Sequence, residues 1–104
     1  MFYTSNNKSL VDFVTVFTYL SQESYWAQGI PEETVRRSIE NSVCFGVYEE
    51  GTDRQVGFAR LITDQATFAY LCDVFILPEF QGRGLFEVES NGRWMTRKFP
   101  DIYR

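Results

Sequence analysis

The pattern of apolar and polar positions predicts two helices in the first half of the chain. Residues 9–20 place apolar side chains three and four positions apart, the period of a helix with a wide buried face, and Ser9, followed by Asp12, gives a cap signal at its start. A second helix is predicted over residues 31–41. Pro31 has the fixed φ that suits the first helical position, and the acidic residues after it suit the positive end of the helix dipole.

The same pattern predicts strands before and after these helices. A short strand is expected over residues 2–5, and three longer strands are expected over residues 43–48, 55–62 and 71–77. Residues 71–77 are almost continuously apolar, interrupted only by Asp73, which is typical of a strand buried on both faces. Because short turns join the last three strands, they predict an antiparallel meander. The expected fold class is α+β, with two N-terminal helices and a mostly antiparallel sheet of about three to four strands.

Length and charge narrow the class of protein. The chain has 104 residues, so we expect a single domain over residues 1–104. A hydrophobic fraction of 44% argues against an intrinsically disordered chain, and a net charge of −4 argues against a broad basic surface for nucleic acid. The first residues lack the pattern of a signal peptide, and no apolar run approaches the ~20 residues that span a bilayer. We therefore expect a cytoplasmic protein without a membrane partner.

The absence of histidine and the small number of cysteines limit the chemistry. Cys44 and Cys72 lie in different apolar segments, and without a secretory signal they are expected to be free buried thiols rather than a disulfide. Without histidine, His-based triads are excluded, and two cysteines do not complete a common zinc shell, so no metal site is expected. Catalysis would then use a carboxylate, a tyrosine, a thiol or the backbone.

A glycine-spaced basic loop follows the last predicted strand. After Pro78 the chain contains Gln81-Gly82-Arg83-Gly84, which combines small residues with a cation. Where a helix begins at such a loop, backbone N–H groups converge on an anion, and the arginine adds charge-assisted hydrogen bonds. The sequence therefore predicts a phosphate-binding loop.

The segment from Asp73 to Leu85, DVFILPEFQGRGL, together with the helices and hairpin before it, resembles the acetyl-CoA-binding motif of the GNAT superfamily of N-acetyltransferases. The family's loop follows the pattern Gln/Arg-x-x-Gly-x-Gly/Ala, and the similarity, to small bacterial members, covers residues 1–85. The resemblance implies acetyl-CoA as the cofactor and direct attack of a small-molecule or peptide amine on its thioester. It implies that the main chain at Val74, Phe75 and Ile76 pairs with the pantetheine arm of coenzyme A. It also implies that the pyrophosphate lies on Gln81, Gly82, Arg83, Gly84, Leu85 and Phe86.

Two features depart from the family pattern. Phe86 stands where Gly or Ala would let the backbone approach the pyrophosphate. Family members continue into a long helix, a fifth strand and a further helix, whereas 19 residues remain here, so we expect that an internal stretch has been lost. Residues 84–90 fit a short helix, and residues 86–90 equally fit a hairpin strand before Asn91-Gly92. The alternative function is therefore a catalytically impaired domain that binds coenzyme A, or that forms a dimer or another protein contact through its exposed sheet edge or C-terminal segment.

Candidates for catalysis and substrate contact lie in or beside the strand predicted over residues 71–77, and in the loop between the helices. Asp73 fits a base with a raised pKa, or equally a strand-edge carboxylate bonded to a neighbouring backbone group or to an arginine. Tyr70 and Tyr25 fit either the border of the acetyl site or ordinary packing. Tyr25 and Trp26 fit a substrate-facing wall or a loop that covers the core. Tyr103 would replace the family's acid, which protonates the departing thiolate, if the tail folds back or a second subunit supplies it.

Overall fold

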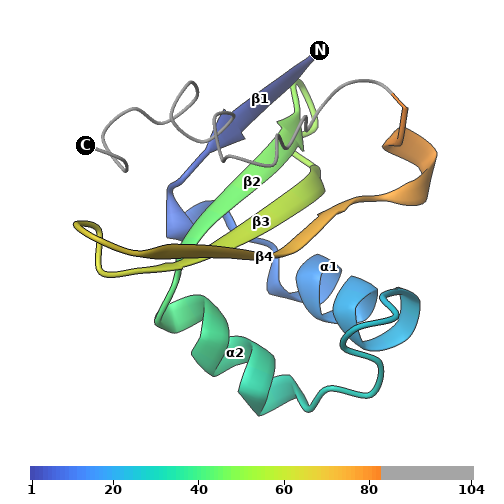
Figure 1. Ribbon diagram of the computed structural model, residues 1–104. Helices are drawn as coiled ribbons and strands as arrows, with labels where there is room; N and C mark the ends of the chain where they lie inside the picture. The colour runs from blue at the N-terminus through green and yellow to red at the C-terminus, as the bar shows by residue number, and fades with distance from the viewer. Residues whose placement is uncertain (83–104) are drawn as a thin grey trace.

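The computed structural model describes residues 1–82 and shows one antiparallel sheet with both helices on the same face (Figure 1). Four strands lie in the order β1-β2-β3-β4, and each pairs antiparallel with the next. This is the α+β architecture that the sequence predicts. The strands are β1 (Phe2–Ser5), β2 (Val43–Glu49), β3 (Gln55–Thr63) and β4 (Ala69–Ile76), and the helices are α1 (Phe13–Thr18) and α2 (Glu32–Glu40).

A tight turn joins β2 to β3, and a pair of stacked rings joins β1 to β2. Gly51 and Asp53 both have positive φ in the turn between β2 and β3, a conformation that glycine and aspartate adopt more readily than most residues. At the outer edge of the sheet the rings of Tyr3 and Tyr48 stack with their centroids 5.3 Å apart, which anchors β1 on β2. The strands predicted from the sequence are all confirmed, with small shifts at their ends.

The continuous helix predicted over residues 9–20 is wrong. A 3₁₀ turn at Lys8–Leu10 comes first, α1 follows after a break, and a π-helical turn at Tyr19–Glu23 completes the segment. Asp12 rather than Ser9 caps α1, because its carboxylate accepts a hydrogen bond from a backbone N–H of the first turn. Val14 fits the apolar period but is 69% exposed, so the buried face is also narrower than predicted.

The second predicted helix is confirmed, with a shift of one residue at each end. Because α2 runs from Glu32 to Glu40, Pro31 takes the N-cap rather than the first helical position, and Asn41 takes the C-cap. Arg36 forms exposed ion pairs of 3.8 and 4.0 Å with the two glutamates of the first turn. Its guanidinium also lies 4.2 Å from the centroid of the Phe13 ring, so it links α2 to α1.

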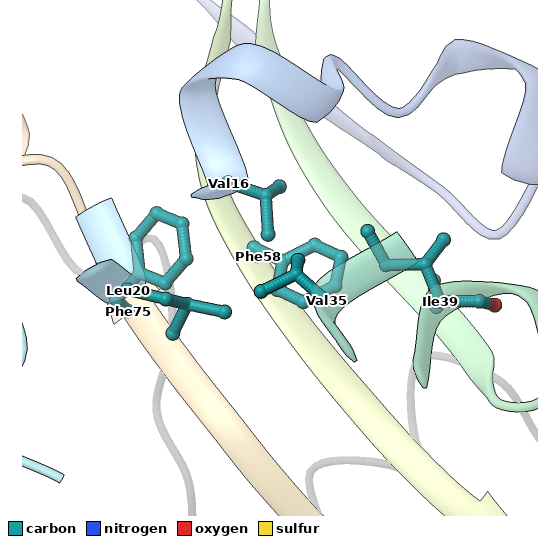
Figure 2. Packing of buried hydrophobic residues seen from close by; sticks show 7 residues of the cluster. Val16, Leu20, Val35, Ile39, Phe58 and Phe75 are labelled. Atoms are coloured by element: carbon teal, nitrogen blue, oxygen red, sulfur yellow. The ribbon is translucent and has the colours of Figure 1, made fainter. Parts of the chain in front are cut away.

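One apolar cluster joins the helices to the sheet (Figure 2). Its labelled members are Val16, Leu20, Val35, Ile39, Phe58 and Phe75, and each is at most 8% exposed. Burying such a side chain contributes about 1.5–3 kcal/mol, so this layer fixes both helices against β3 and β4. None of the helices described over residues 1–82 has the length and apolarity needed to cross a membrane.

Strand β4 lies at the edge of the described sheet, so the prediction that it is buried on both faces is wrong. Within residues 1–82 it pairs with β3, and Phe75 is its one buried residue. The apolar residues of β4 nevertheless serve both faces of the sheet. Phe75 joins the cluster under the helices, whereas Leu71 and Val74 pack on a separate cluster around Leu61. An edge position therefore leaves most of β4 half-buried.

Candidate functional site

A β-bulge interrupts the pairing of β3 and β4 in the middle of β4. Phe58 pairs with Phe75 and Arg60 pairs with Cys72, so two residues of β4 lie opposite one residue of β3. The first of these two, Asp73, has a φ of 55°, in the left-handed region that few residues other than glycine adopt. The bulge bends the strand and takes backbone groups at this point out of the regular ladder.

The carboxylate of Asp73 is held from two sides. Its Oδ2 accepts a hydrogen bond of 2.8 Å from Nε of Arg60, and its Oδ1 accepts one of 2.9 Å from Nε1 of Trp26. Arg60 also donates from Nη1 to Oγ of Ser42, at 3.0 Å. The side chains of Arg60 and Asp73 are 16% and 12% exposed, so the ion pair is largely buried. The structure therefore joins Asp73 to an arginine, and its predicted role as a base stays a prediction.

The bulge borders a hollow of about 330 Å³ beside the loop between the helices. Trp26, Tyr70 and residues 71–74 line this hollow, so the structure brings four of the predicted site residues together: Trp26, Tyr70, Asp73 and Val74. Tyr25 is 89% exposed and contacts the edge of the Trp26 ring at a centroid distance of 5.1 Å. The loop between the helices thus forms one wall beside β4.

The outer edge of β4 carries backbone groups that do not face β3. Leu77 donates its N–H to the Val56 carbonyl at 2.8 Å, so by strand alternation the backbone of Ile76 faces away from β3. The Ile76 carbonyl accepts a hydrogen bond of 2.9 Å from Nε2 of Gln81. Two of the predicted cofactor residues are therefore joined, and the loop after β4 is tied back to the strand edge.

The helix side of β4 contains a second hollow, of about 260 Å³, at the start of the loop. Tyr19 lines it, and its ring stacks on Phe75 at a centroid distance of 4.0 Å. Burial raises the pKa of the Tyr19 hydroxyl above the ordinary value of a tyrosine. Arg54 and Glu79 also line this hollow, and a hydrogen bond of 3.0 Å from Arg54 lowers the pKa of the Glu79 carboxyl.

The first part of the predicted phosphate loop falls within the described residues. A 3₁₀ turn at Pro78–Phe80 follows β4, and Gly82 then has a φ of 81°. Among residues 1–82, no atom outside its chain neighbours lies within 4 Å of the place that a Cβ would take, so the described residues leave the backbone of Gly82 open to a close approach. The remaining sequence-based assignments lie outside the described residues; they concern Arg83, Gly84, Leu85, Phe86, Tyr103 and the helix or hairpin after residue 84.

Both cysteines are free, as predicted, but Cys72 is half-buried rather than buried. Cys72 lines the hollow beside Trp26, whereas Cys44 lies under α2. Burial raises the pKa of the Cys72 thiol and raises the pKa of the Cys44 thiol to about 11. Because the thiolate is the nucleophilic form, these environments oppose a role for either residue in covalent catalysis.

Sequence reasoning missed Arg60, Ser42 and Tyr19. A signal for Arg60 was present, because it is the single charged residue of β3 just as Asp73 is the single charged residue of β4. Opposite single charges in neighbouring buried strands indicate an ion pair. Ser42 and Tyr19 had no comparable signal, since their partners come from distant parts of the chain.

A further hollow, of about 320 Å³, lies near the end of α2 and the start of β2, with Ser42 and Cys44 among its lining residues. Asn6, Lys8, Asn41 and Gln65 are among the residues that line it. None of the site residues predicted from the sequence borders this hollow, so it is the natural comparison site for binding experiments.

Comparison with known proteins gives consistent matches. The model of the acetyltransferase (GNAT) family matches residues 13–86. A protein of Gibberella zeae that is provisionally named an acetyltransferase is 33% identical over 110 residues, which cover 89% of this chain and 59% of that protein. This chain therefore spans less than two thirds of the length of that relative.

Two solved structures share the fold. A crystal structure from Xanthomonas campestris pv. campestris, provisionally described as a GNAT-family acetyltransferase, has a TM-score of 0.82 at 40% identity and covers 100% of this chain and 73% of that chain. A Staphylococcus aureus protein, described as of unknown function and as a candidate acetyltransferase, has a TM-score of 0.68 at 16% identity with the same coverage, which supports the fold alone. Because the family model matches more than half of its residues, the chain belongs to the acetyltransferase (GNAT) family.

Proposed function

We propose that the protein transfers an acetyl group from acetyl-CoA to the amine of a small molecule or peptide. The observation that carries this proposal is the bulged edge of β4, which within residues 1–82 pairs on one side and leads into a glycine-containing loop in a chain of the GNAT family. A strand edge holds an extended ligand through backbone hydrogen bonds, in the same way as it would hold an added strand.

The described residues fit the two ends of the cofactor. The backbone of Ile76 faces away from β3, one residue beyond Phe75 and close to the bulge, which suits the amide-containing pantetheine arm. Open space beside Gly82 leaves room for a phosphate. The proposed cofactor residues are Val74, Phe75, Ile76, Gln81 and Gly82, with Arg83, Gly84, Leu85 and Phe86 completing the loop.

Bound acetyl-CoA supplies an activated thioester. The amine nitrogen bonds to the acetyl carbon as the carbon–sulfur bond breaks, the amine gives a proton to a base or water relay, and the thiolate takes up a proton. Tyr70 and Asp73 border the hollow of about 330 Å³ and are the residues proposed from sequence for proton transfer. Tyr19, which stays protonated on the helix side of Phe75, is a further candidate donor.

The acceptor amine would enter beside the loop between the helices. The rings of Trp26 and Tyr70 line the hollow and are 43% and 59% exposed, so they offer an aromatic surface to an incoming group. Tyr25 extends this surface outward from Trp26. The proposed substrate wall is thus separate from the proposed phosphate loop and lies on the other side of the bulge.

Calorimetric titration with coenzyme A tests the proposal on the wild-type protein and on two arginine variants, one in the proposed loop and one control. Arg83→Gln removes the cation of the proposed loop, and the loss of a charge-assisted hydrogen bond is expected to weaken binding about tenfold or more. Arg37→Gln removes an equal charge from the exposed end of α2 and should leave the affinity unchanged. Equal affinities of all three proteins would show that the loop does not hold the phosphates.

Fragments of the cofactor separate the two halves of the proposed site. Pantetheine tests the strand edge without phosphates, and adenosine 3′,5′-bisphosphate tests the phosphate-binding loop without the arm. We expect each fragment to compete with coenzyme A and each to bind more weakly than the whole. Absence of any binding by coenzyme A at millimolar concentration would overturn the proposed function.

The same open edge supports a second candidate function, a protein-interaction or dimerisation module. Within residues 1–82 the edge of β4 pairs on one side, and the neighbouring Phe68 and Tyr70 are 61% and 59% exposed. A second copy that pairs with this edge would block the proposed pantetheine site. Light scattering with and without coenzyme A distinguishes the two, because a dimer that forms through this edge should dissociate as the cofactor binds.

A further inference from the structure

Asp73 has a positive φ within a strand, a backbone conformation that is unfavourable for residues other than glycine. Among the described residues three other than glycine have positive φ, and two of them, Asp53 and Gln65, lie in turns. Asp73 is the one that lies inside a strand, with a φ of 55°. Such a backbone persists when surrounding contacts determine it, and it is often found where function depends on geometry.

The contacts that hold Asp73 come from separate parts of the chain. Arg60 on β3 donates to Oδ2 at 2.8 Å, and Trp26 in the loop between the helices donates to Oδ1 at 2.9 Å. Ser42, before β2, accepts from Arg60 at 3.0 Å and so limits the orientation of the guanidinium. We call Trp26, Ser42, Arg60 and Asp73 the bulge clamp. Both carboxylate oxygens of Asp73 are therefore engaged.

The bulge clamp lies where the proposed site needs a fixed backbone. Asp73 and Val74 are the two residues of the bulge, and both line the hollow of about 330 Å³. A change of φ at Asp73 would redirect the backbone of Val74, which is one of the proposed cofactor residues and lines the hollow where the acceptor amine would enter. By contrast, Gly82 lies beyond the end of β4 and is not part of the bulge.

We propose that Arg60 is a positioning residue, which acts through the Asp73 carboxylate to keep the bulge in the geometry that orients the acetyl group. Asp73 then serves as the acceptor at the centre of the bulge clamp rather than as the base. This inference rests on the proposed function for its consequence, whereas the structural effect on the bulge is independent of it.

Two measurements on the full chain test the inference. The three-bond coupling between the amide and α protons of Asp73 reports its φ directly. The ratio of the affinities for acetyl-CoA and coenzyme A reports the contribution of the acetyl group. In Arg60→Met we expect the coupling to move to that of an extended residue and the ratio to change about fivefold, the effect of one hydrogen bond. The affinity for coenzyme A itself should change less than the affinity for acetyl-CoA.

Matched variants separate positioning from a general effect on folding. Arg60→Lys keeps the charge and should restore part of both signals, and Arg36→Met removes an ion-paired arginine from α2 and should change neither. If Arg60→Met does not fold, Trp26→Phe and Ser42→Ala each remove one hydrogen bond of the bulge clamp and are expected to shift both signals in the same direction. Unchanged signals in the variants that fold would overturn the inference.

The Asp73→Asn variant distinguishes the two roles of this residue. A positioning role predicts that the coupling and the affinity ratio change together, as in Arg60→Met. Loss of transfer with an unchanged coupling would identify Asp73 as the base and contradict the inference. If the wild-type chain binds no coenzyme A, the proposed function fails, and the coupling alone then decides whether the bulge clamp sets the backbone of Asp73.

Discussion

Arg60 and Asp73 form a largely buried ion pair at the β-bulge between β3 and β4. Removing one partner of a buried pair leaves an uncompensated charge, which costs far more than loss of an exposed pair. The remaining described ion pairs, such as Arg36 with Glu32 at 3.8 Å, lie on the surface. The two kinds of pair therefore predict different effects on stability.

Arg60→Met is expected to lower the free energy of unfolding by about 3–5 kcal/mol, because Asp73 would keep a buried charge without its cation. Urea unfolding followed by circular dichroism measures the change. Arg36→Met, the control, should cost less than about 1 kcal/mol, since its pairs are exposed. Equal losses in the two variants would mean that the buried pair contributes no more than a surface pair.

The buried thiol of Cys44 predicts a loss of stability at alkaline pH. Burial raises its pKa from 9.0 to about 11, so the folded protein favours the neutral thiol. The stabilisation is fully present below pH 9 and is lost as the pH rises through the folded pKa of about 11. Unfolding free energies measured between pH 8 and about 11 should fall less steeply in Cys44→Ala than in the wild type. Identical slopes would contradict the assignment.

The elements show which features could be predicted from the sequence and which could not. Strands β2 and β3 were predicted closely, because their apolar runs end at turn residues such as Gly51. The break before α1 was missed, since the apolar period continues through it and the capping contact at Asp12 is not visible in that period. The edge position of β4 was also missed, because a continuous apolar run does not reveal how many neighbours a strand has.

Substitutions at Asp12 test whether this residue caps α1. Asp12→Ala removes the carboxylate that accepts from the Thr15 backbone and hydroxyl, and should cost about 1 kcal/mol of unfolding free energy. Asp12→Asn retains a capping oxygen and should lie close to the wild type. Ser9→Ala changes the other candidate cap and should have little effect, because Ser9 bonds to exposed Asn7 instead. A larger loss in Ser9→Ala than in Asp12→Ala would contradict the observed start of α1.

At the scale of the whole molecule, the sheet brings together residues that are distant in sequence. The pairing of strands and the packing of the helices place Trp26 beside Tyr70 and Asp73, which no local pattern reveals. The loop at Gln81 and Gly82 was predictable, because its glycine spacing is local.

The proposed function places coenzyme A along the outer edge of β4 and the loop that follows it. The most direct test is a titration of isotopically labelled protein with acetyl-CoA, observed through its backbone amide resonances. We expect saturable shifts that are largest at Val74, Ile76 and Gly82, with little change at Asn6 and Gln65 in the hollow of about 320 Å³ near the end of α2. Shifts centred on that hollow, or none at millimolar acetyl-CoA, would contradict it.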